Sequence, residues 1–306
     1  MINHYNAANK SRTKKGIFII LLCLTVLITS TPLAAETGKY PRVARGLLDL
    51  SSWNLARNGD ITLNGEWEFY WNEYMSPSAL ETSTVSPAYI TVPYAWHNQA
   101  INGMSLPRHG YASYRLTIIL PPADNSMKAL KLPAIYDAYR LWANGNLTAV
   151  SGNPGTSLED TKPYGEPRIV LVQPQDGKLD LLLQVANFHH INGGIRQEII
   201  FGTPEQMIRR QKLSLSLQLF LMGGMLLMGP YFIVHFLFRK EEKYALYFGL
   251  FCLAMAFRLF FADEAPVYLL FPDFSWHAAK RLEFIFFTVA CPCIFVLSIT
   301  CIPNTY

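Results

Sequence analysis

The spacing of apolar residues divides the chain into unlike parts. From residue 36 to 212, short apolar runs rich in β-branched and aromatic side chains alternate with stretches of proline, glycine, asparagine and aspartate. Such runs are typical of strands separated by turns. No long amphipathic helix interrupts them, so residues 36–208 are predicted to form an all-β sandwich. The predicted strands lie at 90–92, 112–120, 129–132, 139–143, 169–172 and 179–185.

Beyond residue 212 the pattern becomes almost continuously apolar. Of the 94 residues from 213 to 306, 62 are apolar, against 74 of the 177 residues from 36 to 212. The apolar runs at 213–238, 244–262 and 282–302 are each long enough to cross about 30 Å of hydrocarbon. The prolines and glycines inside them are tolerated in membrane helices. We therefore predict an α-helical transmembrane bundle, with three spans, within residues 209–306.

The first 35 residues have the layout of a secretory signal peptide. Four basic residues precede an apolar run over 16–29, and small residues end the segment at Ala34 and Ala35. An uncleaved membrane anchor is the alternative. Both interpretations export the β domain, and the basic loop at 239–243 then lies on the cytoplasmic side, in agreement with the positive-inside rule. Basic residues at 209–212 and 280–281 fall on the outer side, against that rule, and we give precedence to the signal sequence.

Charge and cysteine content argue against nucleic-acid binding and against a disulfide-held domain. The net charge is +4, but residues 36–212 hold 16 basic and 16 acidic residues, so no basic patch for nucleic acid is predicted. None of the five cysteines lies in that part, so the β domain has no disulfide framework. Two of the cysteines, Cys291 and Cys293, flank Pro292 as in the copper element of copper-pumping ATPases. The phosphorylated loop and nucleotide domain of such pumps have no counterpart here, and we predict no metal and no cofactor.

Several blocks of the β domain resemble a known sugar-binding fold. The segment Leu63–Trp71, which reads LNGEWEFYW, is similar to the opening of the jelly roll in family 2 glycoside hydrolases. The later blocks at 114–117, 138–145 and 181–187 are similar to strands of galactose-binding-like domains. The resemblance implies a carbohydrate-binding jelly roll. It does not extend to the catalytic barrel of those hydrolases, so we expect no enzyme.

The apolar segment resembles a receptor family. Lys243–Leu253, together with the blocks 257–260, 274–277 and 281–284, is similar to the membrane module of bacterial seven-transmembrane receptors with diverse intracellular signalling modules. The family implies seven spans and a cytoplasmic output domain, whereas residues 1–306 contain three spans. We therefore expect a receptor truncated before its output module. The resemblance places it in the bacterial inner membrane, with residues 36–212 in the periplasm.

Candidate ligand contacts come from loop-like stretches, where the ligand sites of sandwiches usually lie. Each could instead be an ordinary core or solvent-facing residue. Two adjacent histidines on a strand point to opposite faces, which disfavours one shared metal ion. The candidates are Tyr94, Trp96, His97, Asn98, Tyr111, His189 and His190. In the bundle, Arg258 and Glu283 are candidates for a charge pair that couples the spans, although each could simply face the membrane interface.

These observations favour a signal-transduction receptor. Its outer domain would sense a small molecule, in one version a carbohydrate, and bias the packing of the spans. The alternative is a carbohydrate-binding or adhesion protein of the envelope that the spans merely anchor, although one span would suffice for that. A copper-handling transporter rests only on Cys291 and Cys293. The expected partners are the ligand, the lipid bilayer and an output module outside these residues; a homodimer is left open.

Overall fold

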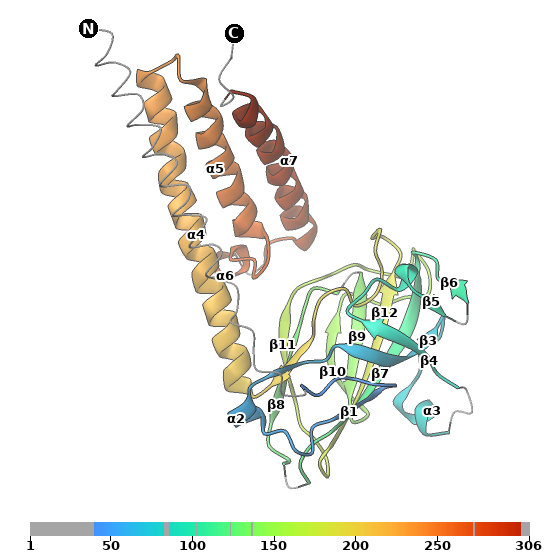
Figure 1. The fold of residues 1–306 in the computed structure, drawn as a ribbon. Helices are drawn as coiled ribbons and strands as arrows, with labels where there is room; N and C mark the ends of the chain where they lie inside the picture. Colours follow the sequence, from blue (N-terminus) through green and yellow to red (C-terminus); the bar gives the residue numbers. More distant parts are fainter. Residues whose placement is uncertain are drawn as a thin grey trace. The chain divides into compact units, whose positions relative to one another are not determined.

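The computed structural model describes residues 40–300 except 83–85, 102, 123, 136 and 272. The signal sequence predicted over residues 1–35 lies outside the described residues, as does the end of the third predicted span. The described chain begins with a β domain and continues into long helices (Figure 1).

The larger of two sheets is built around two ten-residue strands, β7 (Gly110–Ile119) and β12 (Lys178–Asn187), which pair antiparallel over their full length. Its order is β10-β9-β12-β7-β3-β4, and β1 pairs with β7 in parallel beyond the end of β3. The remaining strands of this sheet are β1 (Leu47–Asp49), β3 (Gly65–Trp71), β4 (Ala88–Val92), β9 (Ala138–Ala143) and β10 (Asn146–Ser151).

The second sheet is smaller and has the order β11-β8-β13-β2. Its strands are β2 (Ile61–Thr62), β8 (Lys128–Leu132), β11 (Arg168–Val172) and β13 (Ile200–Gly202). A two-stranded hairpin of β5 (Ala100–Ile101) and β6 (Met104–Ser105) stands apart from both. The short helical elements are α2 (Leu55–Asn58), α3 (Pro77–Thr82) and the 3-10 turn η1 (Trp96–Asn98).

One hydrophobic core joins the two sheets. Trp67 and Tyr114 from the larger sheet are 1% exposed, and Leu130 and Phe201 from the smaller sheet are fully buried in the same cluster. Burial of an aromatic or leucine side chain stabilises a fold by roughly 1.5–3 kcal/mol, so a disulfide-free domain of this size can be held by its core. Each of the six predicted strands overlaps an observed one.

The helical part consists of α4 (Pro204–Phe238), α5 (Lys243–Phe261), the short α6 (Val267–Leu270) and α7 (Trp276–Thr300). Among the described residues, α4 and α5 are long and apolar enough to cross a membrane. Large apolar side chains such as Phe220 and Leu227 are 76% and 78% exposed, as expected for a surface that faces lipid rather than water. That α7 also spans the membrane stays a prediction.

Small residues let α4 and α5 approach closely. A side chain added at Gly249 would lie 2.8 Å from the backbone oxygen of Gly229, so the two glycines permit backbone contact between these helices. A short charged turn connects them, in which Glu242 accepts hydrogen bonds from Arg239 at 3.0 Å and pairs with His235 at 2.7 Å.

Helix α4, which contains the first predicted span, begins earlier than predicted. It starts at Pro204, whereas the sequence places the first span from Leu213. Thr203 and Gln206 form a capping box in which each side chain accepts the other's backbone N–H, and proline occupies the first helical position. These signals are independent of hydrophobicity, which is why the apolar run alone located the start too late.

Replacement of Gln218 by leucine is expected to lower the stability of the helical part by about 1–3 kcal/mol. Gln218 of α4 is buried, and its Nε2 donates to Leu259 O at 2.6 Å, in the last turn of α5, and to Ala262 O at 2.8 Å, just beyond that helix. Interhelical hydrogen bonds of this kind contribute about 0.6–2 kcal/mol each in membranes. Thermal unfolding of the full chain in detergent measures the effect. The exposed Gln211→Leu is the control, and equal melting temperatures for the two variants would contradict the expectation.

Candidate functional site

Apart from Tyr111, the predicted ligand contacts fall into two groups, a first group in the stretch 94–98 and a second group in the loop 188–194, and the two groups meet at one end of the β domain. The backbone N–H of Trp96 donates to Gly193 O at 3.1 Å, which ties η1 to the loop that follows β12. An added side chain at Gly193 would lie 2.3 Å from the Trp96 ring, so only glycine allows this close approach. The stretch 94–98 and the loop 188–194 are therefore neighbours although they are about 90 residues apart in sequence.

Within the first group, the residues differ in what they can offer a ligand. Trp96 is 0% exposed; its Nε1 donates to Arg108 O at 3.2 Å, and its ring packs edge-on against Trp71 at 5.1 Å. Its ring thus belongs to the core and presents no face for stacking. Tyr94 is 60% exposed and Asn98 is also exposed, so both are accessible.

His97 and Tyr111 are only partly exposed. Partial burial, reinforced by the positive charge of Arg108, lowers the pKa of His97 and so favours its neutral form. Tyr111 packs against Tyr74 with ring centroids 4.8 Å apart. Tyr111 is paired with Ala186 near the end of β12, so this aromatic pair lies close to the start of the loop 188–194.

Asp137 anchors the second group. Its Oδ2 accepts the backbone N–H of Phe188 at 2.7 Å and of His189 at 2.6 Å, and lies 3.1 Å from His189 Nδ1. His190 accepts the Asn192 backbone N–H at its Nδ1, and burial together with Arg196 lowers its pKa. The two imidazoles are thus held by different partners, and the part of the chain that the structure describes contains no cluster of three or more metal-ligating side chains.

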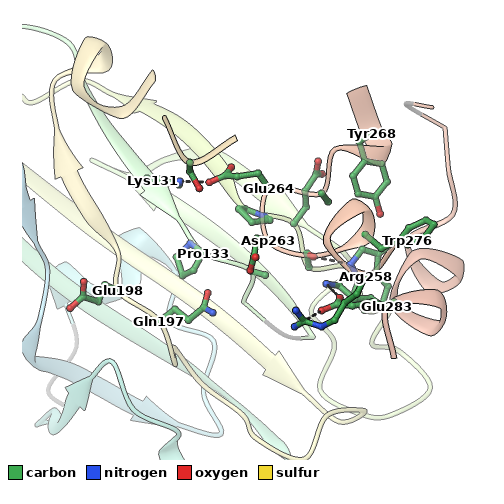
Figure 2. Close-up of a pocket in the computed structure, with 18 of the residues that line it drawn as sticks. Lys131, Pro133, Gln197, Glu198, Arg258, Asp263, Glu264, Tyr268, Trp276 and Glu283 are labelled. Carbon is green, nitrogen blue, oxygen red and sulfur yellow. Dashed lines mark hydrogen bonds and ion pairs between the residues drawn. The ribbon is translucent and has the colours of Figure 1, made fainter. Parts of the chain in front are cut away.

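A second region, which the sequence did not indicate, is a cavity of about 510 Å³ between the β domain and the helices. Figure 2 shows its walls. One wall comes from β8 and the segments 165–167 and 197–200; the other comes from the end of α5, the connection 263–268 and the start of α7. Five acidic and three basic residues line it: Glu166, Glu198, Asp263, Glu264, Glu283, Lys131, Arg258 and Lys280.

One ion pair crosses this cavity. Lys131 Nζ on β8 donates to Glu264 Oε1 at 2.6 Å, and the two side chains are 19% and 8% exposed. Low exposure strengthens the attraction, but it also makes each charge costly without the other. The pair therefore fixes the connection between α5 and α6 against the smaller sheet.

The predicted charge pair of the bundle lies in the same cavity wall. Arg258 and Glu283 approach to 3.8 Å, and Glu283 also accepts a hydrogen bond from Lys280 at 2.8 Å. The structure thus brings together the two residues that the sequence nominated. Their role in coupling the spans stays a prediction.

Three further contacts attach the helices to the β domain. Trp276 Nε1 at the start of α7 donates to Gly165 O at 2.8 Å. At the base of α4, Arg210 pairs with Asp60, and Gln206 Nε2 donates to Leu55 O at 2.7 Å. The β domain is therefore joined both to the root of α4 and to the segment between α5 and α7.

Residues 214–304 match the sequence model of the family described as 7TM diverse intracellular signalling. The match covers less than half of the chain, and it supports the predicted relationship to membrane signalling receptors and a membrane location for the helical part. A comparison with curated proteins finds no match.

Solved structures similar to this chain include glycosidases. A GH2 β-galacturonidase from Eisenbergiella tayi bound to galacturonate has 15% identity and a TM-score of 0.33, over 47% of this chain and 24% of its own. A β-glucuronidase from Ruminococcus gnavus has 12% identity and a TM-score of 0.36, over 48% and 29%. The Faecalibacterium prausnitzii β-glucuronidase has 14% identity and a TM-score of 0.36, over 47% and 31%. This chain thus corresponds to less than a third of each of these proteins.

Proposed function

We propose that this chain is the sensing part of a bacterial membrane receptor for signal transduction. The family match over residues 214–304 carries the proposal. In this assignment residues 36–212 lie in the periplasm, the turn at 239–243 lies in the cytoplasm, and the spans of the inner membrane pass the signal to an output module outside residues 1–306. The chain itself performs no catalysis.

The attachments between the β domain and the helices support a route for the signal. The β domain meets α4 through Asp60–Arg210 and meets the α5–α7 segment through Lys131–Glu264 and Gly165–Trp276. A ligand shifts the bundle only if its affinity differs between two arrangements of these contacts. Because α4 leaves the β domain as a capped helix, a movement at its root is transmitted along the helix rather than absorbed by a flexible linker.

The ligand proposed for the outer domain is a small molecule, with a carbohydrate as the favoured class. Exposed Tyr94, the pair Tyr74–Tyr111 and the polar loop 188–194 lie at one end of the sandwich. Aromatic faces together with amide and imidazole groups are a common combination for sugar binding, because the ring packs on C–H groups while the polar groups accept and donate to hydroxyls.

A saccharide screen on the full chain in nanodiscs tests the proposal. We expect one class of saccharide to raise the melting temperature, and hydrogen exchange to slow both in the loop 188–194 and in the connection 262–271. Tyr94→Ala should weaken the effect, whereas Tyr40→Ala, far along the chain from either group, should not. A saccharide that protects only the sandwich would favour an anchored adhesion protein instead, and the absence of any saccharide effect would contradict the ligand class.

A further inference from the structure

We propose that the cavity between the β domain and the α5–α7 segment binds a small zwitterion, a ligand with an ammonium group at one end and an anionic group at the other. None of the seven predicted ligand contacts of the β domain lines this cavity. The proposal does not depend on whether the chain signals, because it concerns binding alone.

The cavity has the size and walls of a small-molecule site. Its volume of about 510 Å³ falls within the roughly 300–1,000 Å³ of known ligand pockets. Apolar side chains, including Pro133, Pro167, Phe261 and Trp276, form part of the lining, and charged groups stand between them. Such a mixture buries the body of a ligand while a few polar groups fix its orientation.

The positive end of the cavity is Arg258. A guanidinium has five N–H donors, yet within the described ranges Arg258 makes no side-chain hydrogen bond. Its contacts are Glu283 at 3.8 Å and the face of Phe287 at 5.4 Å. Lys280 already holds the other oxygen of Glu283, so one carboxylate serves two cations. The planar fork of Arg258 is therefore available for a carboxylate or phosphate, which it can bind with two parallel hydrogen bonds.

The candidate anionic groups of the lining are Asp263 and Glu198. In the part of the chain that the structure describes, Asp263 has neither an ion pair nor a side-chain hydrogen bond. Glu198 accepts one hydrogen bond, from Asn64 Nδ2 at 2.7 Å, and feels the charge of Arg210 without pairing with it. Figure 2 shows Glu198 and Arg258 on opposite sides of the cavity. An ammonium group would supply the cation that these carboxylates lack.

The other acidic groups of the lining are already neutralised. Glu264 pairs with Lys131 at 2.6 Å and Glu166 pairs with Arg168 at 3.5 Å. The charges left over are positive at Arg258 and negative at Asp263 and Glu198, and Glu198 lies across the cavity from Arg258. That separation favours a zwitterion over a simple anion or a simple cation, since either of the latter would leave one end of the cavity unpaired.

Tyr268 offers a further donor. Its hydroxyl lies on the cavity wall, is buried, and has no hydrogen-bond partner within the described residues. Burial raises the pKa of this phenol to about 12, so the hydroxyl keeps its proton at neutral pH. A buried polar group without a partner is energetically costly, and a bound ligand with an acceptor would remove that cost.

Two kinds of ligand have this pair of charges: a free amino acid and the ethanolamine headgroup of a phospholipid. Calorimetric titration of the full chain in nanodiscs of phosphatidylglycerol alone distinguishes them, with each standard amino acid and glycerophosphoethanolamine as probes. We expect at least one probe to bind. For an amino acid that binds, its N-acetyl derivative and its amide should each bind at least tenfold more weakly, because each lacks one of the two charges.

Variants test the placement of the ligand. Arg258→Gln and Asp263→Asn should each weaken binding by roughly ten- to a hundredfold, the effect of losing one charged hydrogen bond. Arg281→Gln and Asp273→Asn, exposed positions in the same region, should leave it unchanged. Asp263 makes no contact that its amide would break, so this variant keeps the test valid even if Arg258→Gln unfolds.

Three results would overturn the proposal: no binding by any probe, an amide that binds as tightly as its parent amino acid, or unaltered binding by Asp263→Asn. Binding of glycerophosphoethanolamine without any amino acid would assign the site to the lipid headgroup and retain the zwitterion. A negative result for zwitterion binding would not affect the saccharide response of the sandwich, so the two proposals are tested independently.

Discussion

Replacement of Asp137 by leucine is expected to lower the free energy of unfolding of the β domain by about 2–4 kcal/mol. The side chain is 3% exposed, and its carboxylate accepts two backbone N–H groups at 2.6 and 2.7 Å. Leucine has no acceptor, so both N–H groups of the loop after β12, whose hydrogen bonds are partly buried, lose their partner; a fully buried group left unpaired costs about 1–3 kcal/mol. The recovered cost of burying a charge offsets part of this loss.

Urea unfolding followed by tryptophan fluorescence measures the change. Five of the six tryptophans precede residue 212, so the signal reports mainly on the β domain. Asp137→Asn, which keeps one acceptor oxygen, should lose about half as much stability as the leucine variant. Exposed Glu159→Leu serves as the control and should change the free energy by less than about 0.5 kcal/mol. A loss below 1 kcal/mol for Asp137→Leu would show that the loop does not depend on this anchor.

Replacement of Lys131 by methionine is expected to release the connection between α5 and α6 from the β domain. Methionine keeps the apolar stem but leaves Glu264, which is 8% exposed, without its cation. Breaking a buried pair costs about 3–5 kcal/mol, and the partial exposure of Lys131 reduces this to about 2–3 kcal/mol. Amide exchange in residues 262–271 should then be roughly 30- to 150-fold faster, if opening of this contact limits it.

A charge reversal provides the decisive control. The double variant Lys131→Glu with Glu264→Lys should recover most of the protection, whereas each single reversal should be worse than methionine because it places like charges together. Lys178→Met, at an exposed position of β12, should leave exchange in 262–271 as it is. Unchanged exchange in the Lys131 variant would mean that this contact does not hold the helices to the sheet.

Local patterns predicted six strands and the long apolar helices, but they left out β1, β3, β10 and the shortest strands. The six predicted strands have enough alternating or apolar residues to be recognised by period, whereas β2 and β13 have two and three residues and take their form from pairing with each other and with β8. The start of α4 depends on a capping box rather than on hydrophobicity. Strands this short form because neighbouring strands pair with them, so the local sequence pattern could not predict them.

The site was predictable in part, for the same reason. Loop position nominated Tyr94 and the two histidines, but no pattern revealed that Trp96 turns inward to pack against Trp71. Arg258 and Glu283 could be nominated because charges in apolar segments are rare. Lys131 and Glu264 are 133 residues apart and lie in segments with nothing unusual, so only the folded chain reveals the cavity that they share.

The unbroken length of α4 determines how far the β domain stands from the membrane. Thirty-five residues at 1.5 Å each make a rod of about 52 Å, while the hydrocarbon layer takes about 30 Å. Some 20 Å of the helix must therefore stand in or beyond the headgroup layer, and the root of the β domain is raised by that amount. Ser214, which lines the cavity, lies about 15 Å along this rod from Pro204. The cavity consequently opens near the headgroup layer, where a ligand arrives by moving along the membrane surface as much as from the bulk solution.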